Sequence, residues 1–438
     1  MKQLTLTLWL WLAAGASLLA QTDVLQSGPM VGYSSMREAL LWVQTTEAAE
    51  VQFAYSNGEE TYRTQAYQTH AGEAFTARLV ADQVQPGQTY TYELYLDGEQ
   101  VERPYPMQFK TPPLWQYRSD PPEMRFALGS CTFVNEPRYD RPGDGYGGGY
   151  GIFETMAEAK PDFTLWLGDN TYLREADFYS QTGIMHRYTH TRSLPEMQPL
   201  LAVAPNYAIW DDHDYGPNNS DRSYREKATT LEAFKLFWGN PTYGIGEAIG
   251  GTVSMFEWGD AHFFLLDDRY FRTPNDLEGE RTILGAAQRQ WLIDALVSSR
   301  AKWKFVCVGG QMLNPVEKYE TFANIAPEER EAILAAIGQH EVRNVVFLTG
   351  DRHHSELSLT ERNGIKIYDF TASPLTSGAH NAEDEANTLR VEGSQVGIRN
   401  YGLITLTGPR KARKLRFAFY DADGEELWAY EIDEQPWE

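Results

Sequence analysis

Beyond about residue 122, short apolar runs alternate with segments whose apolar residues recur every three or four positions, and few architectures suit such an alternation. The short runs predict buried strands, and the longer segments predict helices that pack on them. Strands are expected at residues 126–128, 163–167, 207–210, 263–266, 305–308, 345–348 and 367–370, and helices at 152–159, 227–238, 288–297 and 328–337. This pattern is typical of a layered α/β domain. The tail, at 403–406 and 415–420 with a turn at 421–424, is expected to close the domain as a hairpin.

The first hundred residues follow a different pattern, in which short alternating segments are separated by turn residues. The segments at 39–43, 51–55, 74–79 and 90–96 predict strands, and Asn-Gly, Pro-Gly and Asp-Gly pairs at 57–58, 86–87 and 97–98 lie between them. We therefore expect a small all-β, Ig/Fn3-like sandwich over residues 23–113. The α/β domain is expected over residues 122–432.

Polar residues follow the apolar runs of the α/β domain at four places. Cys131 follows the run at 126–128, Asp169 that at 163–167, His213 that at 207–210, and Asp351 that at 345–348. Ligands of open α/β sheets bind beyond the carboxy ends of the strands. One polar ending can be a helix cap or a turn, but four of them favour a site for metals or proton transfer at one edge of the sheet.

Asp169 and Tyr172 place a carboxylate and a phenol on one tight turn after Gly168. A carboxylate there can bridge two metals, and a phenolate can bind a hard trivalent one. The alternative is that Asp169 caps a helix and Tyr172 packs in the core. Cys131 can bind a metal as a thiolate, although an isolated cysteine is by default a buried small hydrophobe. Cys307, inside an apolar run, is better explained as core.

Asp212 and His213 offer a metal-binding carboxylate beside an imidazole that can donate a proton to a leaving oxygen near neutral pH. Asn218 and Asn219 follow in a short polar loop, where plain turn residues are an equal alternative.

Asp351 and His353 lie two residues apart after one strand, so both side chains can reach the same cluster. His354 ranks below His353, because a packed or supporting histidine explains it equally well.

The charge of the chain limits its partners. The 438 residues carry a formal net charge of -23, whereas binding to a polyanion normally needs a basic surface. Nucleic acid is therefore not an expected partner. A small phosphoester stays compatible with this charge, because metal cations can reverse the local field.

The N-terminus has the pattern of an export signal: Lys2, an apolar run at 4–12 and small residues at 13–16. We expect a signal peptide over residues 1–20 and a periplasmic or secreted protein. The apolar run is shorter than the ~20 residues that a membrane-spanning helix needs, so no transmembrane anchor is expected. Two cysteines are too few for a disulfide framework.

These segments resemble the metallophosphoesterase superfamily, and more closely its alkaline phosphatase D (PhoD-like) branch, which pairs an N-terminal sandwich with a phosphatase domain. The resemblance spans about residues 25–430. It rests on an ordered set of motifs: Gly129-Ser-Cys131, the segment 160–172, Trp210-Asp-Asp-His213, 266–269, 284–292 and Gly350-Asp-Arg-His353. It implies a four-layer αββα domain. The superfamily's usual opening Asp-x-His or Asp-x-Gly is absent here, and Cys131 takes that place by the family comparison alone.

The resemblance also implies a centre of Fe3+ and Ca2+, with other divalent metals as alternatives. The residues that would surround the iron are Cys131, Asp169, Tyr172 and His353, and those that would face calcium are Asp169, Asp212, Asn218 and Asp351. His213 would match the general acid, and Arg269 or Asn170 would steady the phosphate. Asn219 is an alternative to Asn218, because the segment after His213 differs in spacing from the one expected.

We therefore expect an exported alkaline phosphatase in which a metal-bound hydroxide attacks phosphorus in line. The expected substrate is a small-molecule or lipid-like phosphoester, and the oligomeric state is undefined. An alternative is a phosphodiesterase or phospholipase D type activity on larger esters. A rival of another class is a surface or carbohydrate-binding protein with a degenerate α/β domain. Retention of the whole candidate site disfavours that rival.

Overall fold

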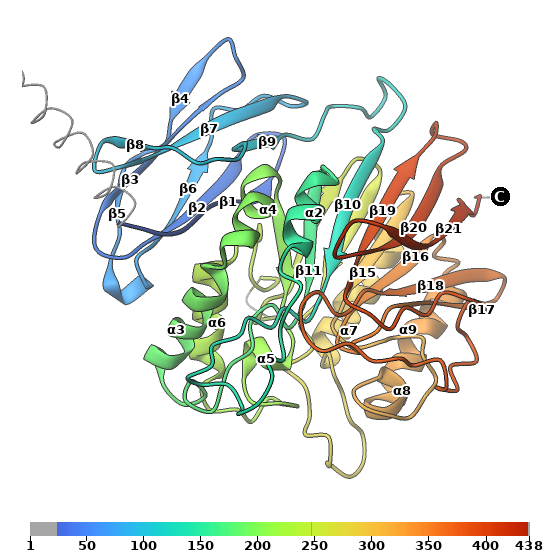
Figure 1. The fold of residues 1–438 in the computed structure, drawn as a ribbon. Coiled ribbons are helices and arrows are strands. Elements are labelled where there is room, and N and C mark those ends of the chain that lie inside the picture. The colour runs from blue at the N-terminus through green and yellow to red at the C-terminus, as the bar shows by residue number, and fades with distance from the viewer. Residues whose placement is uncertain (1–23, 247, 437–438) are drawn as a thin grey trace, which may run out of the picture.

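The chain forms an all-β region that leads into a larger α/β region (Figure 1). The computed structural model describes residues 24–246 and 248–436. The expected signal peptide at 1–20 lies outside the described residues. The mixed α/β fold agrees with the sequence-based expectation.

The N-terminal region consists of two sheets with strand orders β1-β2-β6 and β4-β3-β7-β8, and β5 and β9 pair with β3 and β7. Their facing side chains form one apolar core. The expected segments lie in β2, β3, β6 and β7, whereas β1 was not predicted. The strands are β1 Leu25–Ser34, β2 Ala39–Thr45, β3 Glu50–Ser56, β4 Thr61–Arg63, β5 Tyr67–Gln68, β6 Thr76–Ala81, β7 Thr89–Leu96, β8 Glu99–Val101 and β9 Gln108–Lys110.

Two six-stranded sheets form the centre of the α/β region. The first has the order β12-β11-β10-β19-β20-β21, and β10 to β12 run parallel. The second has the order β13-β14-β15-β16-β18-β17, and β14, β15, β16 and β18 run parallel. The strands are β10 Met124–Gly129, β11 Phe163–Leu167, β12 Asn206–Ile209, β13 Ser254–Trp258, β14 Ala261–Leu265, β15 Trp303–Cys307, β16 Val345–Thr349, β17 Glu356–Arg362, β18 Ile365–Thr371, β19 Asn400–Thr407, β20 Lys414–Asp421 and β21 Glu426–Asp433.

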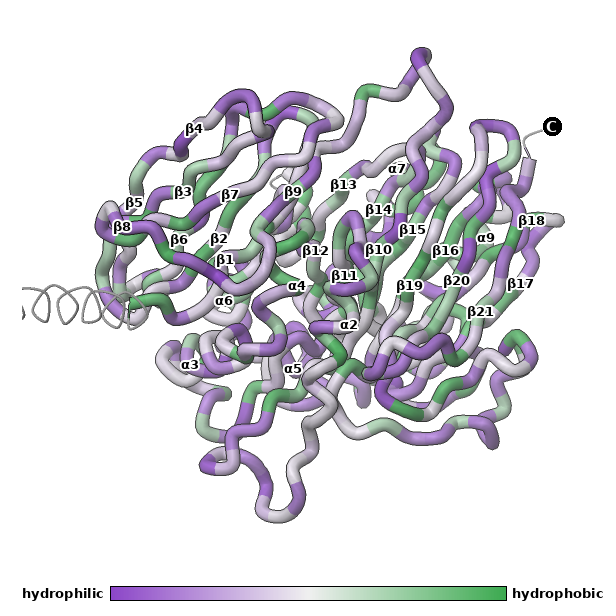
Figure 2. Tube along the Cα trace, turned by 45° about the horizontal axis from the view of Figure 1, so that its top comes forward, coloured by the Kyte–Doolittle hydropathy of each residue, from purple (hydrophilic) through white to green (hydrophobic). Residues whose placement is uncertain are grey.

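The side chains of these strands alternate between two faces, because successive residues of a strand point to opposite sides. Phe126 and Phe305 belong to an apolar core between the sheets. Trp166 belongs to a second core, between the first sheet and the helices on its outer face. Val306 belongs to a third core, between the second sheet and the helices on its outer face. The layers are therefore helix, sheet, sheet and helix, and hydrophobic residues concentrate on the strands (Figure 2).

Helices cover the outer faces of both sheets. The expected helices correspond to α2, α6, α7 and α9. Helix α3 was not predicted, because its residues show little segregation of apolar from polar side chains. The helices are α2 Ile152–Glu158, α3 Gln181–Arg192, α4 Gln198–Val203, α5 Asp212–Tyr215, α6 Lys227–Phe237, α7 Ala286–Ser298, α8 Phe322–Ile325 and α9 Pro327–Gln339, with 3-10 turns η1 Ala71–Glu73 and η2 Pro195–Met197.

The expected closing hairpin is wrong in one respect. Strands β19 and β20 pair as predicted, but the turn at 421–424 leads into a further strand, β21, which pairs with β20. The tail is therefore a three-stranded meander that completes the first sheet.

The N-terminal sandwich is joined to the α/β region by buried hydrogen bonds. The backbone N–H of Gly28 donates to Gln198 Oε1 at 2.7 Å, and Trp42 Nε1–H donates to the carbonyl oxygen of Leu236 at 2.7 Å. Tyr207, at the edge strand β12, bonds through its hydroxyl to the backbone of Ser34. Among the described residues, the helices are all too short or too polar to cross a membrane.

Candidate metal centre

Residues from strand ends of both sheets come together, rather than from the edge of one sheet as expected: Cys131, Asp169 and His353 form one group, and His213 joins Asp169 in another. Cys131 and Asp169 follow β10 and β11 of the first sheet, whereas Asp351 and His353 follow β16 of the second. All four have a positive φ, of 62°, 52°, 62° and 55° respectively. A non-glycine residue in the left-handed region costs about 1–3 kcal/mol, and such strain concentrates at functional sites.

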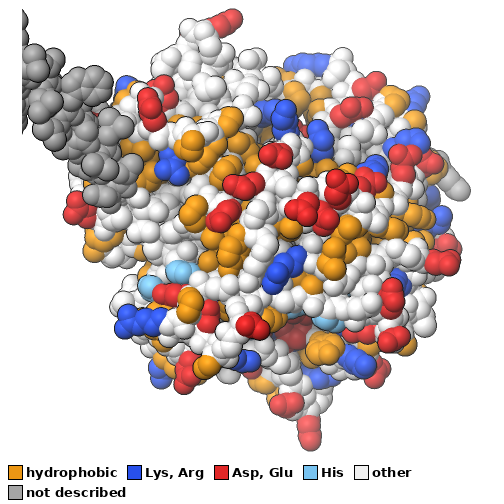
Figure 3. All heavy atoms as spheres, in the orientation of Figure 1, with side chains coloured by type: hydrophobic (Ala, Val, Ile, Leu, Met, Phe, Trp, Pro, Cys, Tyr) orange, Lys and Arg blue, Asp and Glu red, His pale blue; other side chains and the backbone are white. Residues whose placement is uncertain are grey.

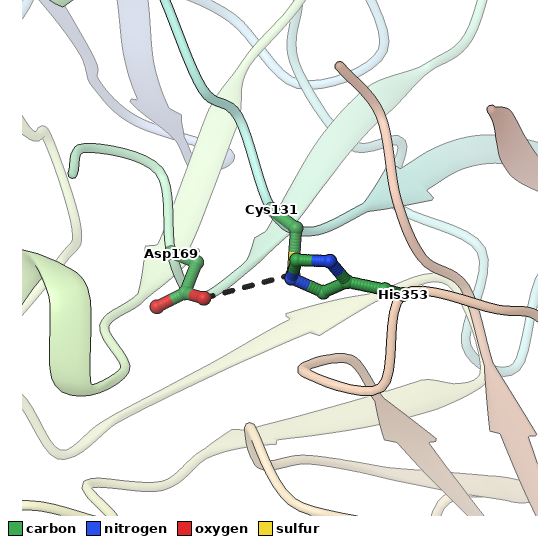
Figure 4. Close-up of side chains that lie close together, drawn as sticks. All are labelled: Cys131, Asp169 and His353. Carbon is green, nitrogen blue, oxygen red and sulfur yellow. Dashed lines mark hydrogen bonds between the residues drawn. The ribbon is translucent and has the colours of Figure 1, made fainter. Parts of the chain in front are cut away.

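The thiol side of the site contains Cys131, Asp169 and His353, whose ligand atoms lie within 4.8 Å of one another. The side chains point toward a common centre, and Cys131 Sγ lies 3.6 Å from Asp169 Oδ2 (Figure 4). The hydroxyl of Tyr172 lies 3.4 Å from His353 Nε2. Both Cys131 and Cys307 are free thiols, so the structure contains no disulfide between them.

The oxygen side of the site contains Asp169, Asp212 and His213, which form a second group within 4.8 Å. Asp169 thus belongs to both groups, as a bridging ligand would. The backbone N–H of Asn219 donates to Asp212 Oδ2 at 2.6 Å. Asn218 and Asn219 are both exposed, so the structure brings only the backbone of Asn219 to Asp212, and the choice between the two side chains stays a prediction.

A third group, of Asp211, Asp212 and Glu320, shares Asp212 with the second. Arg269 is fully buried beside it and forms ion pairs with Asp211 and Glu320. Because both partners are themselves buried carboxylates, its guanidinium is engaged within the protein. This geometry favours a supporting role for Arg269 over the predicted contact with phosphate.

Asp214 connects the turns after β11 and β12. Its carboxylate accepts from the backbone N–H groups of Asn170, Thr171 and Asp211, at 3.2, 2.9 and 3.0 Å. The Asn170 amide donates to the carbonyl oxygen of Ile209 at 2.7 Å, while its Oδ1 is buried without a hydrogen-bond partner. Asn170 is thus held in place by the strand ends and offers one free acceptor.

His353 is oriented by contacts on both ring nitrogens. Its Nδ1 lies 2.7 Å from the carbonyl oxygen of Gly378, which fixes Nδ1 as the donor and turns Nε2 toward Tyr172. His354 is buried and bonds through Nδ1 to the carbonyl of Arg352 at 3.0 Å, which agrees with its lower rank. Asp351 lies outside the three groups of ligand atoms.

Burial and like charge suppress the ionisation of Asp169, Asp351 and Cys131. Burial, with Asp212 and Cys131 as further causes, raises the pKa of Asp169 well above its usual range. Burial and Glu320 raise the pKa of Asp351 to about 6, and burial raises the pKa of the Cys131 thiol to about 11. A bound cation would lower the pKa values of these buried acids again, because it stabilises their ionised forms.

Asp212 and His213 are shifted in a different way. Burial by itself would raise the pKa of Asp212, but His213 and Arg269 outweigh it and the pKa is lowered. Burial lowers the pKa of His213 against the opposing charge of Asp212. The Tyr172 ring stacks on the His213 ring with centroids 4.3 Å apart. These contacts hold His213 at the edge of the cluster.

The donor set fits metal ions of two kinds. A thiol, a phenol and an imidazole surround one end of Asp169, and carboxylates surround the other. Softer or trivalent ions accept the first set, whereas hard cations prefer oxygen. One carboxylate oxygen of Asp211, which shares the third group with Asp212, is buried without a hydrogen-bond partner and is therefore an unused acceptor beside the oxygen side.

Sequence reasoning missed Glu320, Asp268 and Ser373. Glu320 lies in a loop before α8, and Ser373, whose Oγ lies 3.3 Å from Cys131 Sγ, follows β18. The segment around Asp268 was recognised as a motif only. A strand-end search that included β18 would have found Ser373, but no local pattern marks Glu320.

On the face seen in Figure 3, Lys and Arg side chains are scattered among Asp and Glu instead of gathering into a basic surface.

The fold and the candidate site together define a layered α/β protein with a cluster of potential metal ligands at its strand ends. A model of the PhoD-like phosphatase family matches residues 126–407, and the chain belongs to that family. A second model, a domain of unknown function (DUF7800), matches residues 22–114. The expected resemblance to the PhoD-like branch is thus confirmed.

Comparisons with single proteins agree with this placement. The alkaline phosphatase D of Bacillus subtilis (strain 168) is 26% identical, over 72% of this chain and 63% of the relative. The chain therefore spans less than two thirds of that relative's length. A solved structure of PhoD has a TM-score of 0.75 at 20% identity, covering 93% of this chain and 92% of the other. A purple acid phosphatase from yellow lupin seeds has a TM-score of 0.67 at 12% identity, covering 93% and 74%. Both share the fold.

Proposed function

We propose that this chain is a metal-dependent phosphoric ester hydrolase, most simply an alkaline phosphatase. The observation that carries the proposal is the convergence of Cys131, Asp169, Asp212, His213 and His353 from three strand ends of one sheet and one strand end of the other. Membership of the PhoD-like phosphatase family supports the same reaction class.

In this proposal the metal ions are Fe3+ on the thiol side and Ca2+ on the oxygen side, with other divalent ions as alternatives. When bound, they would neutralise charge on the phosphoryl oxygens and supply an activated water. Cys131, Tyr172 and His353 would hold the first ion, and Asp169 would bridge to the second. Asp212, Asp351 and either Asn218 or Asn219 would complete the oxygen side.

His213 and Asn170 would act on the substrate, and Arg269 would support the site. His213 stands at the rim of the cluster with an imidazole that can deliver a proton to the leaving oxygen. Asn170 has a buried amide, and to steady a phosphoryl oxygen its Nδ2–H would have to donate to the substrate instead of to the carbonyl oxygen of Ile209. Arg269, through its ion pairs with Asp211 and Glu320, would fix the loop that carries Asp212 and His213.

We also propose the boundaries and location expected from the sequence. Residues 1–20 would be a signal peptide that directs the protein to the periplasm or outside the cell, residues 23–113 an Ig/Fn3-like domain and residues 122–432 the catalytic domain. The substrate would be a small-molecule or lipid-like phosphoester. A phosphodiesterase or phospholipase D type activity is the alternative within the same site. Burial of the sandwich against the α/β region argues against an independent carbohydrate-binding module.

The test compares 4-nitrophenyl phosphate with bis(4-nitrophenyl) phosphate, before and after the metals are removed with a chelator. We expect hydrolysis of at least one ester, its loss on chelation and its recovery when metal is returned. A faster monoester would support the phosphatase, and a faster diester the alternative. Hydrolysis of neither ester by metal-replete protein would overturn the proposal.

A further inference from the structure

Tyr146 lies beside the candidate metal centre, and the proposed mechanism does not use it. The residue is 45% exposed, whereas Tyr172, the other tyrosine next to His353, is 4% exposed. The hydroxyl oxygen of Tyr146 lies 3.0 Å from Nδ1 of His353. Burial, and after it the charges of Cys131 and Asp169, raise the pKa of this hydroxyl to about 12. One end of the side chain therefore reaches the centre, while part of the residue is open to solvent.

Close contacts fix the position of Tyr146. A Cβ at Gly147 would lie 2.2 Å from the carbonyl oxygen of Phe133, and a Cβ at Gly378 would lie 2.8 Å from the Tyr146 ring. Arg399 donates from Nη2 to the carbonyl oxygen of Tyr146 at 3.1 Å. The chain thus passes close to Phe133 on one side, and the ring lies directly against the backbone of Gly378 on the other. The fold itself therefore sets where the ring lies.

A series of aromatic rings leads from Tyr146 to His213. The Tyr146 and Phe133 rings meet edge to face, with centroids 5.0 Å apart. The Phe133 ring is also 5.0 Å from the ring of Tyr172, which stacks on His213 at 4.3 Å. Phe133 and His213 are both half-buried, and Tyr146 is exposed. Partly accessible aromatic groups thus extend from the proposed general acid to the outside of the site.

The proposed role of His213 places the organic part of the substrate beside these rings. A general acid must lie within hydrogen-bond reach of the oxygen that it protonates. The organic group is attached to that oxygen, so it begins next to the His213 ring. The aromatic rings between His213 and Tyr146 are then the surface that this group can contact.

We propose that Tyr146 is a specificity-determining residue that contacts the organic group of the ester, and that this group is an aromatic ring close to the phosphate. The inference rests on the proposed function and names the substrate class of the same site. Aromatic pairs gain stability beyond the burial of their area, because the edge of one ring attracts the face of another. A saturated ring or a lipid-like chain of the same size gains only from burial.

The experiment measures how tightly two phosphonates bind, because a phosphonate keeps the negative charge of the phosphate but has no ester bond to cleave. Benzylphosphonate carries an aromatic ring, and cyclohexylmethylphosphonate carries a saturated ring of similar size. Their inhibition constants are determined on the full metal-loaded protein, against hydrolysis of 4-nitrophenyl phosphate or its diester. Calorimetry provides the same two constants for a variant whose turnover is slow. We expect benzylphosphonate to bind ~2–10-fold more tightly, the factor that one aromatic pair contributes.

Variants of Tyr146 test the contact. Tyr146→Ala should bring the ratio of the two constants close to 1, and Tyr146→Phe, which keeps the ring, should retain the preference. The ratio is compared within each variant, since a loss of metal or of site geometry weakens the binding of both phosphonates alike. Tyr117→Ala is the matched control: it removes a tyrosine that is 95% exposed in the segment between β9 and β10, and it should keep the ratio of the unaltered protein.

The inference and the proposed function can fail separately. Equal binding of the two phosphonates to the unaltered protein, or a preference that persists in Tyr146→Ala, would overturn the inference and leave the proposed phosphatase in place. Hydrolysis of neither 4-nitrophenyl ester would instead overturn the proposed function.

Discussion

The space between the two sheets and the ends of the same strands are both buried, yet they differ in what their side chains meet. Cys307 of β15 and Cys131 after β10 are each fully buried. Cys307 belongs to an apolar core of aromatic and aliphatic side chains, whereas Cys131 meets Asp169 and Ser373. Burial therefore does not distinguish the two thiols; their partners do.

The backbone conformation also differs between the interior and the strand ends. In the interior, strand residues alternate regularly between two faces, but Cys131, Asp169, Asp351 and His353 all have positive φ. The interior should respond to substitution mainly through stability, and the strand ends mainly through metal content and turnover. The following predictions test this division.

Asp169→Asn should give the largest effect. The amide has the size of the carboxylate but cannot balance two cations, so metal and activity should be lost together, by more than the ~10–100-fold typical of a supporting residue. Elemental analysis and turnover measure this. Asp423→Asn, in the exposed β20–β21 turn, is the control and should change neither. Full metal content in Asp169→Asn would refute the bridging role.

His213→Ala should keep its metals and slow turnover by on the order of 100-fold for an alkyl ester, whose leaving group needs a proton. An activated aryl ester should suffer less. Steady-state rates on the two esters measure the difference. Equal losses on both would indicate that His213 is a ligand or a structural residue.

Cys131→Ser should lower iron content and weaken a visible charge-transfer band, because a thiolate is an electron-rich donor to ferric iron. Tyr172→Phe should shift or weaken the same band. Cys307→Ser is the matched control, since it makes the same chemical change in the apolar interior, and the band should stay. Absorption spectra and thiol counting on denatured, unreduced protein check this, and an absent band in the iron-loaded unaltered protein would contradict it.

The metal-free protein should lose stability as the pH rises from about 4 to 7. Burial raises the folded-state pKa of Asp351 and of Asp268 to about 6, above the unfolded value of about 3.9. The protonated carboxyl groups therefore stabilise the folded protein fully at a pH below the unfolded-state pKa. This stabilisation is lost as the pH rises through the folded-state pKa. Denaturation at several pH values measures this, and Asp268→Asn should reduce the slope. An equal slope in that variant would refute the assignment.

Cys307→Ser should give the smallest effect, a loss of about 1–3 kcal/mol in the free energy of unfolding, because a hydroxyl replaces a thiol in the apolar core. Cys307→Ala should also destabilise while leaving turnover intact. Urea denaturation of metal-loaded protein checks both. Loss of metal from either variant would show that the interior and the strand ends are not independent.

The sequence predicted some residues and elements of the interior and of the strand-end site, but not others. Asp169 and Asp351 could be located because each follows an apolar strand and a glycine. The sequence did not show that their strands belong to different sheets, since strand order depends on long-range pairing. Glu320 was missed because its loop has no period, and β1 because Gly28 and Pro29 interrupt its alternation. Helix α3 was missed because its residues lack an apolar stripe.

The bonds between the sandwich and the α/β region also bear on how the chain is made. Gly28 and Ser34 of β1 find their partners Gln198 and Tyr207 some 170 and 173 positions later. At about 5–20 residues per second, ribosomal synthesis of that stretch takes roughly ten seconds or more. During that time Trp42, whose ring is fully buried in the finished molecule, lacks its partner Leu236. The nascent N-terminal segment therefore presents an apolar surface that a chaperone can hold until the rest of the chain emerges.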